Sequence, residues 1–98
     1  MRVFISQPMN NKSDAEIKEE RKKMEEIACQ LSGQKVEVVE SFFEAAPHDA
    51  RPLWFLGKSL ELLSTADVIL FAPGWENARG CIMEHEAAVR YGIPILVD

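Results

Sequence analysis

The sequence predicts a small doubly wound α/β domain, a three-layer sandwich around a four-stranded parallel sheet with the strand order 2-1-3-4. Two observations favour this class. Short apolar runs alternate with longer segments of helical periodicity along the 98 residues. The run at residues 67–72 is also apolar at consecutive positions, as expected for a strand buried on both faces of a parallel sheet. We therefore expect one domain, residues 1–98, of flavodoxin-like or Rossmann-like architecture.

The first half of the chain predicts a strand, a helix and a second strand. The apolar run at residues 2–6 is the first strand. An S-x-x-E capping box at residues 13–16 begins a long helix with apolar residues at helical spacing, and Gly33 is placed to end it. Residues 36–40 are the second strand, and residues 41–51 lack clear periodicity. The latter segment is expected to be a long loop.

The second half predicts two further helix and strand pairs. Pro52 suits the first turn of a helix, residues 67–72 are the third strand, and residues 94–97 are the last. Gly80 opens a helix that ends before Gly92. The apolar stripe expected on the helix that Pro52 begins consists of Leu53, Leu56, Leu60 and Leu63. Right-handed crossovers between these strands favour a parallel sheet with helices on both faces.

The composition is that of an ordinary globular protein, with 47% hydrophobic and 28% charged residues. No apolar run approaches the roughly 18 residues of a membrane span, and the early first strand leaves no room for a signal peptide. We therefore expect a cytoplasmic protein without membrane contact. A net charge of −5 argues against a nucleic-acid polymer as partner, because such binders usually carry a basic stripe. A small-molecule ligand remains open.

The cysteine and histidine pattern predicts neither a disulfide nor a metal site. Cys29 and Cys81 lie in helical segments without a CxxC spacing, which favours buried, reduced thiols. His85 could share a helix face with Cys81, but a zinc site needs at least about three ligands and His48 is the only other histidine. Glycine-rich motifs for dinucleotides or Walker-type phosphate binding are missing. We expect no cofactor.

The predicted strand order places the loops that begin at Gln7 and Gly74 on either side of one crevice at the carboxyl ends of the strands. Ligands of doubly wound proteins bind there. Glu84 follows the second loop and is expected in the first turn of the third helix, where the helix dipole favours the ionised form of a carboxylate. Glu84 is the candidate reactive residue. The alternative is a glutamate that only complements the dipole.

Other side chains near this crevice are weighed against simpler roles. Glu76 lies in the loop, and Glu86 is turned by about 200° from Glu84 on an ideal helix, so both are expected to face solvent. Trp75 either stacks on a base or sugar or covers the core. A serine or cysteine nucleophile would need an oriented base, which the spacing does not indicate.

Several segments resemble the nucleoside 2-deoxyribosyltransferase superfamily, and the resemblance covers nearly the whole chain. They are Val3-Phe4-Ile5-Ser6-Gln7-Pro8-Met9, Gly74-Trp75-Glu76, Arg79-Gly80-Cys81 and Glu84 followed by Ala87-Ala88. The pattern is most similar to a compact bacterial and phage branch. The resemblance implies a glutamate nucleophile, at Glu84 here, that attacks the anomeric carbon of a 2'-deoxynucleoside or its monophosphate. A carboxylate can trap the resulting oxocarbenium character as a glycosyl ester.

The resemblance also implies the ligand contacts and a homodimer or larger homo-oligomer. The expected contacts are Ser6, Gln7, Pro8, Met9, Ser59, Gly74, Trp75, Asn77 and Gly80. The chain departs from the family at two of them. Ser59 stands where the enzymes usually have an aspartate that assists the base, and Gln7 stands where a glycine is common. A serine is no ordinary acid or base near neutral pH.

Three functions are therefore compared. The leading interpretation is an enzyme that cleaves or transfers at the N-glycosidic bond. The alternative is a nucleotide-binding or sensing module that has lost catalysis, which the two departures motivate. An interaction protein with an empty crevice ranks third. The base preference, the need for a 5'-phosphate and the acceptor, water or a second base, stay open.

Overall fold

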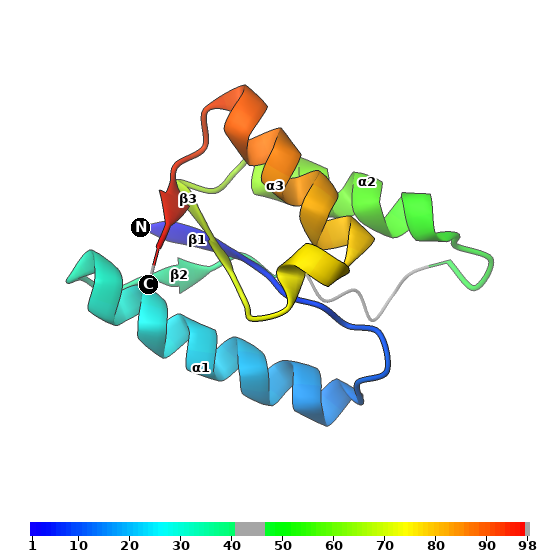
Figure 1. Ribbon diagram of the computed structural model, residues 1–98, viewed down its shortest axis with the longest axis horizontal. Helices are drawn as coiled ribbons and strands as arrows, with labels where there is room; N and C mark the ends of the chain where they lie inside the picture. Colours follow the sequence, from blue (N-terminus) through cyan, green and yellow to red (C-terminus); the bar gives the residue numbers. More distant parts are fainter. Residues whose placement is uncertain (41–46, 98) are drawn as a thin grey trace.

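The computed structural model describes residues 1–40 and 47–97. These residues form, in chain order, β1 (Arg2–Ser6), α1 (Asp14–Ser32), β2 (Glu37–Val38), α2 (Pro52–Leu63), β3 (Val68–Phe71), the 3-10 helix η1 (Trp75–Asn77), α3 (Arg79–Tyr91) and β4 (Ile95–Leu96) (Figure 1). All strand pairs are parallel and the order is β2-β1-β3-β4. The predicted fold class and strand order are confirmed.

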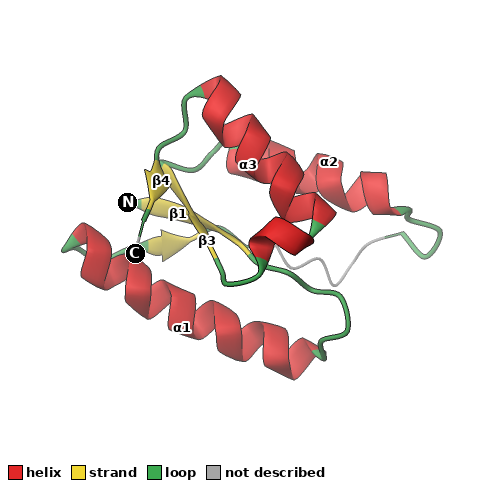
Figure 2. Ribbon diagram, in the orientation of Figure 1, coloured by secondary structure: helices red, strands yellow, loops and turns green. Residues whose placement is uncertain are grey.

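The helices cover both faces of the sheet and make three layers. Helix α1 lies on one face, and α2 and α3 lie together on the other (Figure 2). Side chains of β1 alternate between the faces, because successive residues of a strand point to opposite sides. Val3 and Ile5 pack with Met24 of α1, whereas Phe4 packs with Leu63 of α2. This alternation also turns Ser6 towards the α2 and α3 side.

The ends of α1 follow the predicted signals. The Glu16 backbone N–H donates to Ser13 Oγ at 3.2 Å, and the Ser13 N–H donates to Glu16 Oε1 at 3.1 Å. Both halves of the capping box are therefore present, and two donors of the first turn are satisfied. Gly33 ends the helix at φ 69°, a left-handed conformation that glycine adopts without steric cost. The prediction for this helix is confirmed.

The second and last strands are shorter than predicted. The expected run 36–40 contains only Glu37–Val38 as strand, and 94–97 contains only Ile95–Leu96. Both lie at the edges of the sheet, where each strand has one neighbour to pair with. The third strand also loses both predicted ends and covers Val68–Phe71. Of the loop predicted at 41–51, residues 41–46 lie outside the described residues.

The leucine stripe expected on α2 is wrong at its first position. Leu63 is buried and Leu56 and Leu60 are half-buried, but Leu53 is 78% exposed. The reason is where α2 lies on the sheet. Its last turn packs on the core, while its first turn borders the cavity described below. Periodicity alone does not show how far along a helix the packed surface extends.

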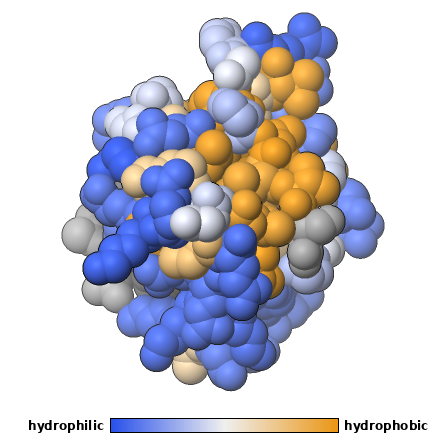
Figure 3. All heavy atoms as spheres, turned by 90° about the vertical axis from the view of Figure 1, so that its left-hand side faces the viewer, coloured by the Kyte–Doolittle hydropathy of each residue, from blue (hydrophilic) through white to orange (hydrophobic). Residues whose placement is uncertain are grey.

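Apolar side chains also reach the surface elsewhere. Figure 3 shows a continuous hydrophobic area on the side where the chain termini and β4 lie in Figure 1. Val97, just after β4, is 76% exposed, and Tyr91 at the end of α3 is 84% exposed. Apolar atoms contribute more than half of an ordinary protein surface, so such exposure does not by itself mark a binding site. Within the described ranges, none of the helices has the length and apolar content needed to cross a membrane.

Candidate functional site

A cavity of about 660 Å³ lies at the carboxyl end of β1, between the loop that follows it and the first turns of α2 and α3. Residues 4–10 form one wall, and residues 78–81 with Met83 and Glu84 form a second. The third wall comes from α2, through Pro52, Leu53, Phe55, Leu56 and Ser59. In the sheet, β1 has β2 on one side and β3 on the other, so the strand order reverses direction between β1 and β3. The cavity lies at this predicted topological switch.

Glu84 is the buried carboxylate of this cavity. Its side chain is 8% exposed and accepts a hydrogen bond of 2.6 Å from Ser6 Oγ to Oε1. The Ser59 hydroxyl also acts on Glu84 and lowers the pKa of the carboxylate. Strand β1 supplies one hydroxyl and helix α2 the other, while α3 carries the carboxylate. Three elements that are distant in sequence thus fix one acidic group.

The structure corrects the expected position of Glu84 on its helix. Helix α3 begins at Arg79, one residue before the predicted Gly80, and its first turn contains no acidic residue. Glu84 therefore lies in the second turn, whereas the helix dipole acts mainly within the first turn. The alternative in which Glu84 only complements the helix dipole assumed a first-turn position, and the structure does not place Glu84 there.

The predicted protonation of Glu84 also needs correction. Burial raises its pKa above the ordinary 4.5, and the hydroxyls of Ser6 and Ser59 oppose that rise only in part. From the sequence we expected the helix dipole to favour the ionised form of Glu84. That expectation did not include burial, which disfavours the charged form. The result is a carboxylate that is more basic than an exposed one and is held in a fixed orientation.

Cys81 lies one turn before Glu84 and also lines the cavity. Burial raises its pKa above the ordinary 9.0; the hydroxyl of Ser6 acts against this and the charge of Glu84 adds to it. The thiol is therefore neutral near pH 7 and is a poor nucleophile. Cys81 is a buried free thiol as predicted, whereas Cys29 is free but only half-buried.

Seven of the predicted site residues line the cavity together. They are Ser6, Gln7, Pro8, Met9, Ser59, Gly80 and Glu84. The lining does not include Gly74, Trp75 or Asn77. The two loops nevertheless approach each other, since a Cβ on Gly74 would lie 3.8 Å from Cγ of Pro8. Gly74 has φ 87°, so a glycine suits this turn for a conformational reason.

Trp75 packs against the protein itself. Its ring stacks on that of His85 with centroids 4.5 Å apart and planes 16° apart, and its distance to the Phe71 ring is 4.9 Å. These contacts hold η1 on α3 and favour the role of a cover for the core. Glu76 and Glu86 are exposed, as predicted.

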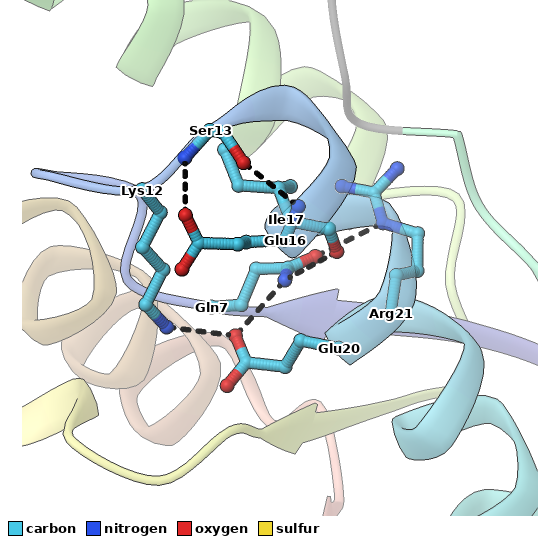
Figure 4. A network of polar contacts seen from close by, with 7 residues as sticks. All are labelled: Gln7, Lys12, Ser13, Glu16, Ile17, Glu20 and Arg21. Atoms are coloured by element: carbon cyan, nitrogen blue, oxygen red, sulfur yellow. Dashed lines mark hydrogen bonds and ion pairs between the residues drawn. The ribbon is translucent and has the colours of Figure 1, made fainter.

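Gln7 lies beside the cavity, but its amide group points the other way. It is hydrogen-bonded to residues of α1 (Figure 4). Gln7 is not among the residues with positive φ, so the position does not require the glycine that is common in the resembling family. A side chain is therefore accommodated at this position without backbone strain.

Sequence reasoning missed several wall residues. Phe55 and Leu56 precede Ser59 by one helical turn, and Cys81 precedes Glu84 in the same way, so helical spacing from the predicted residues would have found them. Arg79 has no such signal. It is the one lysine or arginine on the described lining and belongs to the first turn of α3.

Comparisons of the chain with protein-family models, with curated proteins and with solved structures find no match. Within residues 1–40 and 47–97, no three histidine, cysteine, aspartate or glutamate side chains are grouped to hold a metal ion. The chemistry of the cavity is therefore inferred from its own side chains.

Proposed function

We propose that this protein cleaves or transfers at the N-glycosidic bond of a 2'-deoxynucleoside or its 5'-monophosphate, with Glu84 as the nucleophile. The observation that carries the proposal is the Glu84 carboxylate itself. It is 8% exposed, lies in a largely apolar cavity, accepts a hydrogen bond from Ser6 Oγ, and has its pKa lowered by the nearby Ser59 hydroxyl. An uncharged group would fill such a place at lower cost, because burial of a carboxylate disfavours its ionised form.

The proposed reaction has two steps. In the first, a carboxylate oxygen of Glu84 bonds to the anomeric carbon, while the bond from that carbon to the base breaks. The base leaves with the electron pair and takes up a proton from solvent. In the second, water or another base attacks the same carbon and releases Glu84. Because each step inverts the carbon, the product retains its configuration.

The surroundings of Glu84 suit such a reaction. Positive charge develops on the sugar as the base departs, and a buried carboxylate in a largely apolar cavity stabilises it more strongly than one in bulk water. The Ser6 hydroxyl fixes Oε1, so the carboxylate does not have to be oriented during the reaction. The raised pKa makes the ionised group a more basic nucleophile.

The cavity also has the size and surface for a nucleoside. Its volume of about 660 Å³ lies within the range of roughly 300–1,000 Å³ that is usual for small-ligand sites. Leu53, Phe55, Leu56 and Met83 offer apolar contact to a planar base. Arg79 at the α3 side is the cation available to a 5'-phosphate.

The second candidate function is a nucleotide-binding or sensing module without catalysis. One observation favours it: Ser59 occupies the position of the expected aspartate, and its hydroxyl lowers the pKa of Glu84. A hydroxyl in this position cannot transfer a proton to a departing base as a carboxylic acid does. In this alternative Glu84 is a ligand contact.

The test incubates the protein with the four deoxynucleosides and their monophosphates, with and without a second free base, and separates the products by chromatography. Free base identifies a hydrolase, and an exchanged nucleoside identifies a transferase. We expect Glu84→Ala to abolish turnover while its circular dichroism stays that of the wild type. The matched control is Glu86→Ala, an exposed glutamate of the same helix that pairs with Arg90.

Two outcomes would count against the enzyme. Turnover retained in the Glu84→Ala variant would remove Glu84 from the reaction. No product from any substrate, together with measurable binding of one of them by calorimetry, would favour the binding module.

A further inference from the structure

A group of polar side chains lies behind the loop that lines the cavity, on the α1 side. Gln7 Nε2 donates to Glu20 Oε1 and to the Ile17 carbonyl oxygen, both at 3.1 Å. Arg21 Nε donates to Gln7 Oε1 at 3.0 Å. Lys12 Nζ lies 3.1 Å from the same Glu20 oxygen. We call Gln7, Lys12, Glu20 and Arg21 the brace (Figure 4).

The brace fixes the orientation of the Gln7 amide. Gln7 is 5% exposed, and each end of its amide meets a partner of opposite polarity. A flipped amide would direct its carbonyl oxygen at the Glu20 carboxylate and its NH₂ group at the Arg21 guanidinium. Hydrogen bonds to charged groups are stronger than neutral ones, and a buried amide without partners is costly. One rotamer is therefore strongly favoured.

The brace holds both ends of the loop at one point. Gln7 begins the loop and Lys12 ends it, and both contact Oε1 of Glu20. Between them, Pro8, Met9 and Asn10 line the cavity. Within the loop, the Lys12 N–H donates to the Met9 carbonyl oxygen at 3.3 Å. The Glu20 carboxylate lies on the side of the loop away from the cavity. Through Gln7 and Lys12 it thus determines where this wall of the cavity lies.

The brace is also close enough to act on the cavity electrostatically. Burial, the Ser6 hydroxyl and Glu84 have the largest effects on the pKa of Cys81. The charges of Glu20 and Lys12 follow, and they act in opposite directions. The charges of Glu20 and Lys12 thus oppose each other at Cys81, and the contribution that we assign to the brace is positional.

We propose that Gln7 and Glu20 are positioning residues that fix the ligand-facing loop from behind and so determine how tightly the cavity holds its ligand. The identity of that ligand rests on the proposed function; the fixing of the loop does not. Gln7 stands where the resembling family commonly has a glycine, and a glycine has no side chain with which to form this contact.

The first experiment needs no ligand. Amide hydrogen exchange followed by NMR is compared between wild type, Gln7→Glu, Glu20→Ala and the control Glu19→Ala. Glu19 neighbours Glu20 on α1, but it is exposed and pairs with Lys23 at 4.0 Å. We expect exchange at Lys12, whose N–H donates to Met9, to become about tenfold faster in both brace variants, because a hydrogen bond to a charged group is lost or reversed. The amides of Ile5 and Ala28, and all amides of Glu19→Ala, should be unchanged.

The double variant Gln7→Glu with Glu20→Gln tests the pairing itself. The single Gln7→Glu change sets two carboxylates against each other, while the double variant restores one donor and one acceptor to that pair. We expect exchange at Lys12 to return to within about threefold of wild type. Equal acceleration at Lys12 and at Ala28 would show a general loss of stability and overturn the proposal, as would wild-type exchange in both Gln7→Glu and Glu20→Ala.

The second experiment uses turnover, where the wild type has it. We expect Glu20→Ala to raise KM about tenfold with kcat changed less than twofold, since Glu84 and its hydroxyl partners are untouched. An unchanged KM, or a loss confined to kcat, would overturn the positioning role. If the wild type shows no turnover, the proposed function fails, while the exchange experiment still decides whether the brace holds the loop.

Discussion

At the scale of single residues, the proposed function of this chain depends on the surroundings of Glu84. The alternation of β1 turns Ser6 towards α3, on the side where Phe4 joins the core. An apolar residue at position 6 would continue the packing of Phe4. A serine there instead donates a hydrogen bond to the Glu84 carboxylate. The end of the strand therefore contributes to the candidate site, whereas its earlier residues pack in the core.

The pKa of Glu84 is the first prediction at this scale. A ¹³C NMR titration of its carboxyl carbon should give a pKa above 4.5, because burial exceeds the effect of the two hydroxyls. In Ser6→Ala the pKa should rise further, since a hydrogen bond to the ionised form is removed. The matched control is Ser32→Ala, whose hydroxyl bonds only to backbone groups at the end of α1. A lower pKa in Ser6→Ala would contradict the assignment of this hydrogen bond.

The same shift predicts how stability depends on pH. Because the pKa of Glu84 is higher in the folded than in the unfolded state, the unfolded chain binds fewer protons between the two values. The free energy of unfolding therefore falls as the pH rises through this interval. Each pKa unit corresponds to about 1.4 kcal/mol. Glu84→Gln lacks this dependence and keeps an oxygen that accepts from Ser6.

Urea unfolding of wild type and Glu84→Gln at several pH values checks this. The variant should gain stability relative to wild type from pH 4.5 upwards and level off above the folded pKa. Stabilities that differ by a constant amount across the range would show that the carboxylate carries no burial penalty.

At the scale of elements, α2 divides its length between two tasks. Its last turn packs on the sheet through Leu63, which is 1% exposed, and its first turn borders the cavity through Leu53, which is 78% exposed. The helix therefore connects the core to the site. Ser59 lies between these ends and reaches Glu84.

This division predicts different effects of one substitution at two places. Leu63→Ala should lower the free energy of unfolding by about 2–5 kcal/mol, because it leaves a cavity in the core. Leu53→Ala should change it by less than about 0.5 kcal/mol, as expected for an exposed side chain. Denaturant unfolding of both variants measures the contrast, and equal losses would show that the first turn of α2 is packed in solution.

Leu53→Ala is expected to weaken nucleotide binding, since Leu53 lines the cavity.

At the scale of the whole molecule, the strand order brings the site together. Strand β1 lies between β2 and β3, so the loop after β1 and the start of α3 meet at the switch of direction in the sheet. The network of the brace lies on one side of that loop and Glu84 on the other. The two layers of helices thus act on one cavity from opposite faces of the sheet.

The quaternary state is a prediction at this scale. The resemblance to the deoxyribosyltransferase superfamily implies a homodimer or larger homo-oligomer. Light scattering on the eluted protein should then give at least twice the 11.1 kDa of the chain. A mass of 11.1 kDa at every concentration up to the millimolar range would contradict it.

With a net charge of −5, we also expect no retention of the protein by a nucleic-acid polymer at physiological salt.

The sequence by itself determined the features that depend on neighbours along the chain. The capping box of α1, its end at Gly33 and the start of α2 at Pro52 were all predicted, because each follows from contacts within one helical turn. The parallel sheet with helices on both faces followed from the handedness of crossovers, which is almost invariant, while the order 2-1-3-4 was a prediction that the structure confirms. Glu84 was singled out by its place after the third strand.

Only the tertiary structure decided what surrounds these residues. The sequence placed Glu84 in a first turn with a favoured charge, whereas the structure buries it in the second turn with a raised pKa. It also turned the Gln7 amide to α1 and the Trp75 ring onto His85, away from the cavity. Burial and orientation depend on contacts with side chains that are distant in sequence. A local pattern of residues carries no information about which of these side chains will pack against it.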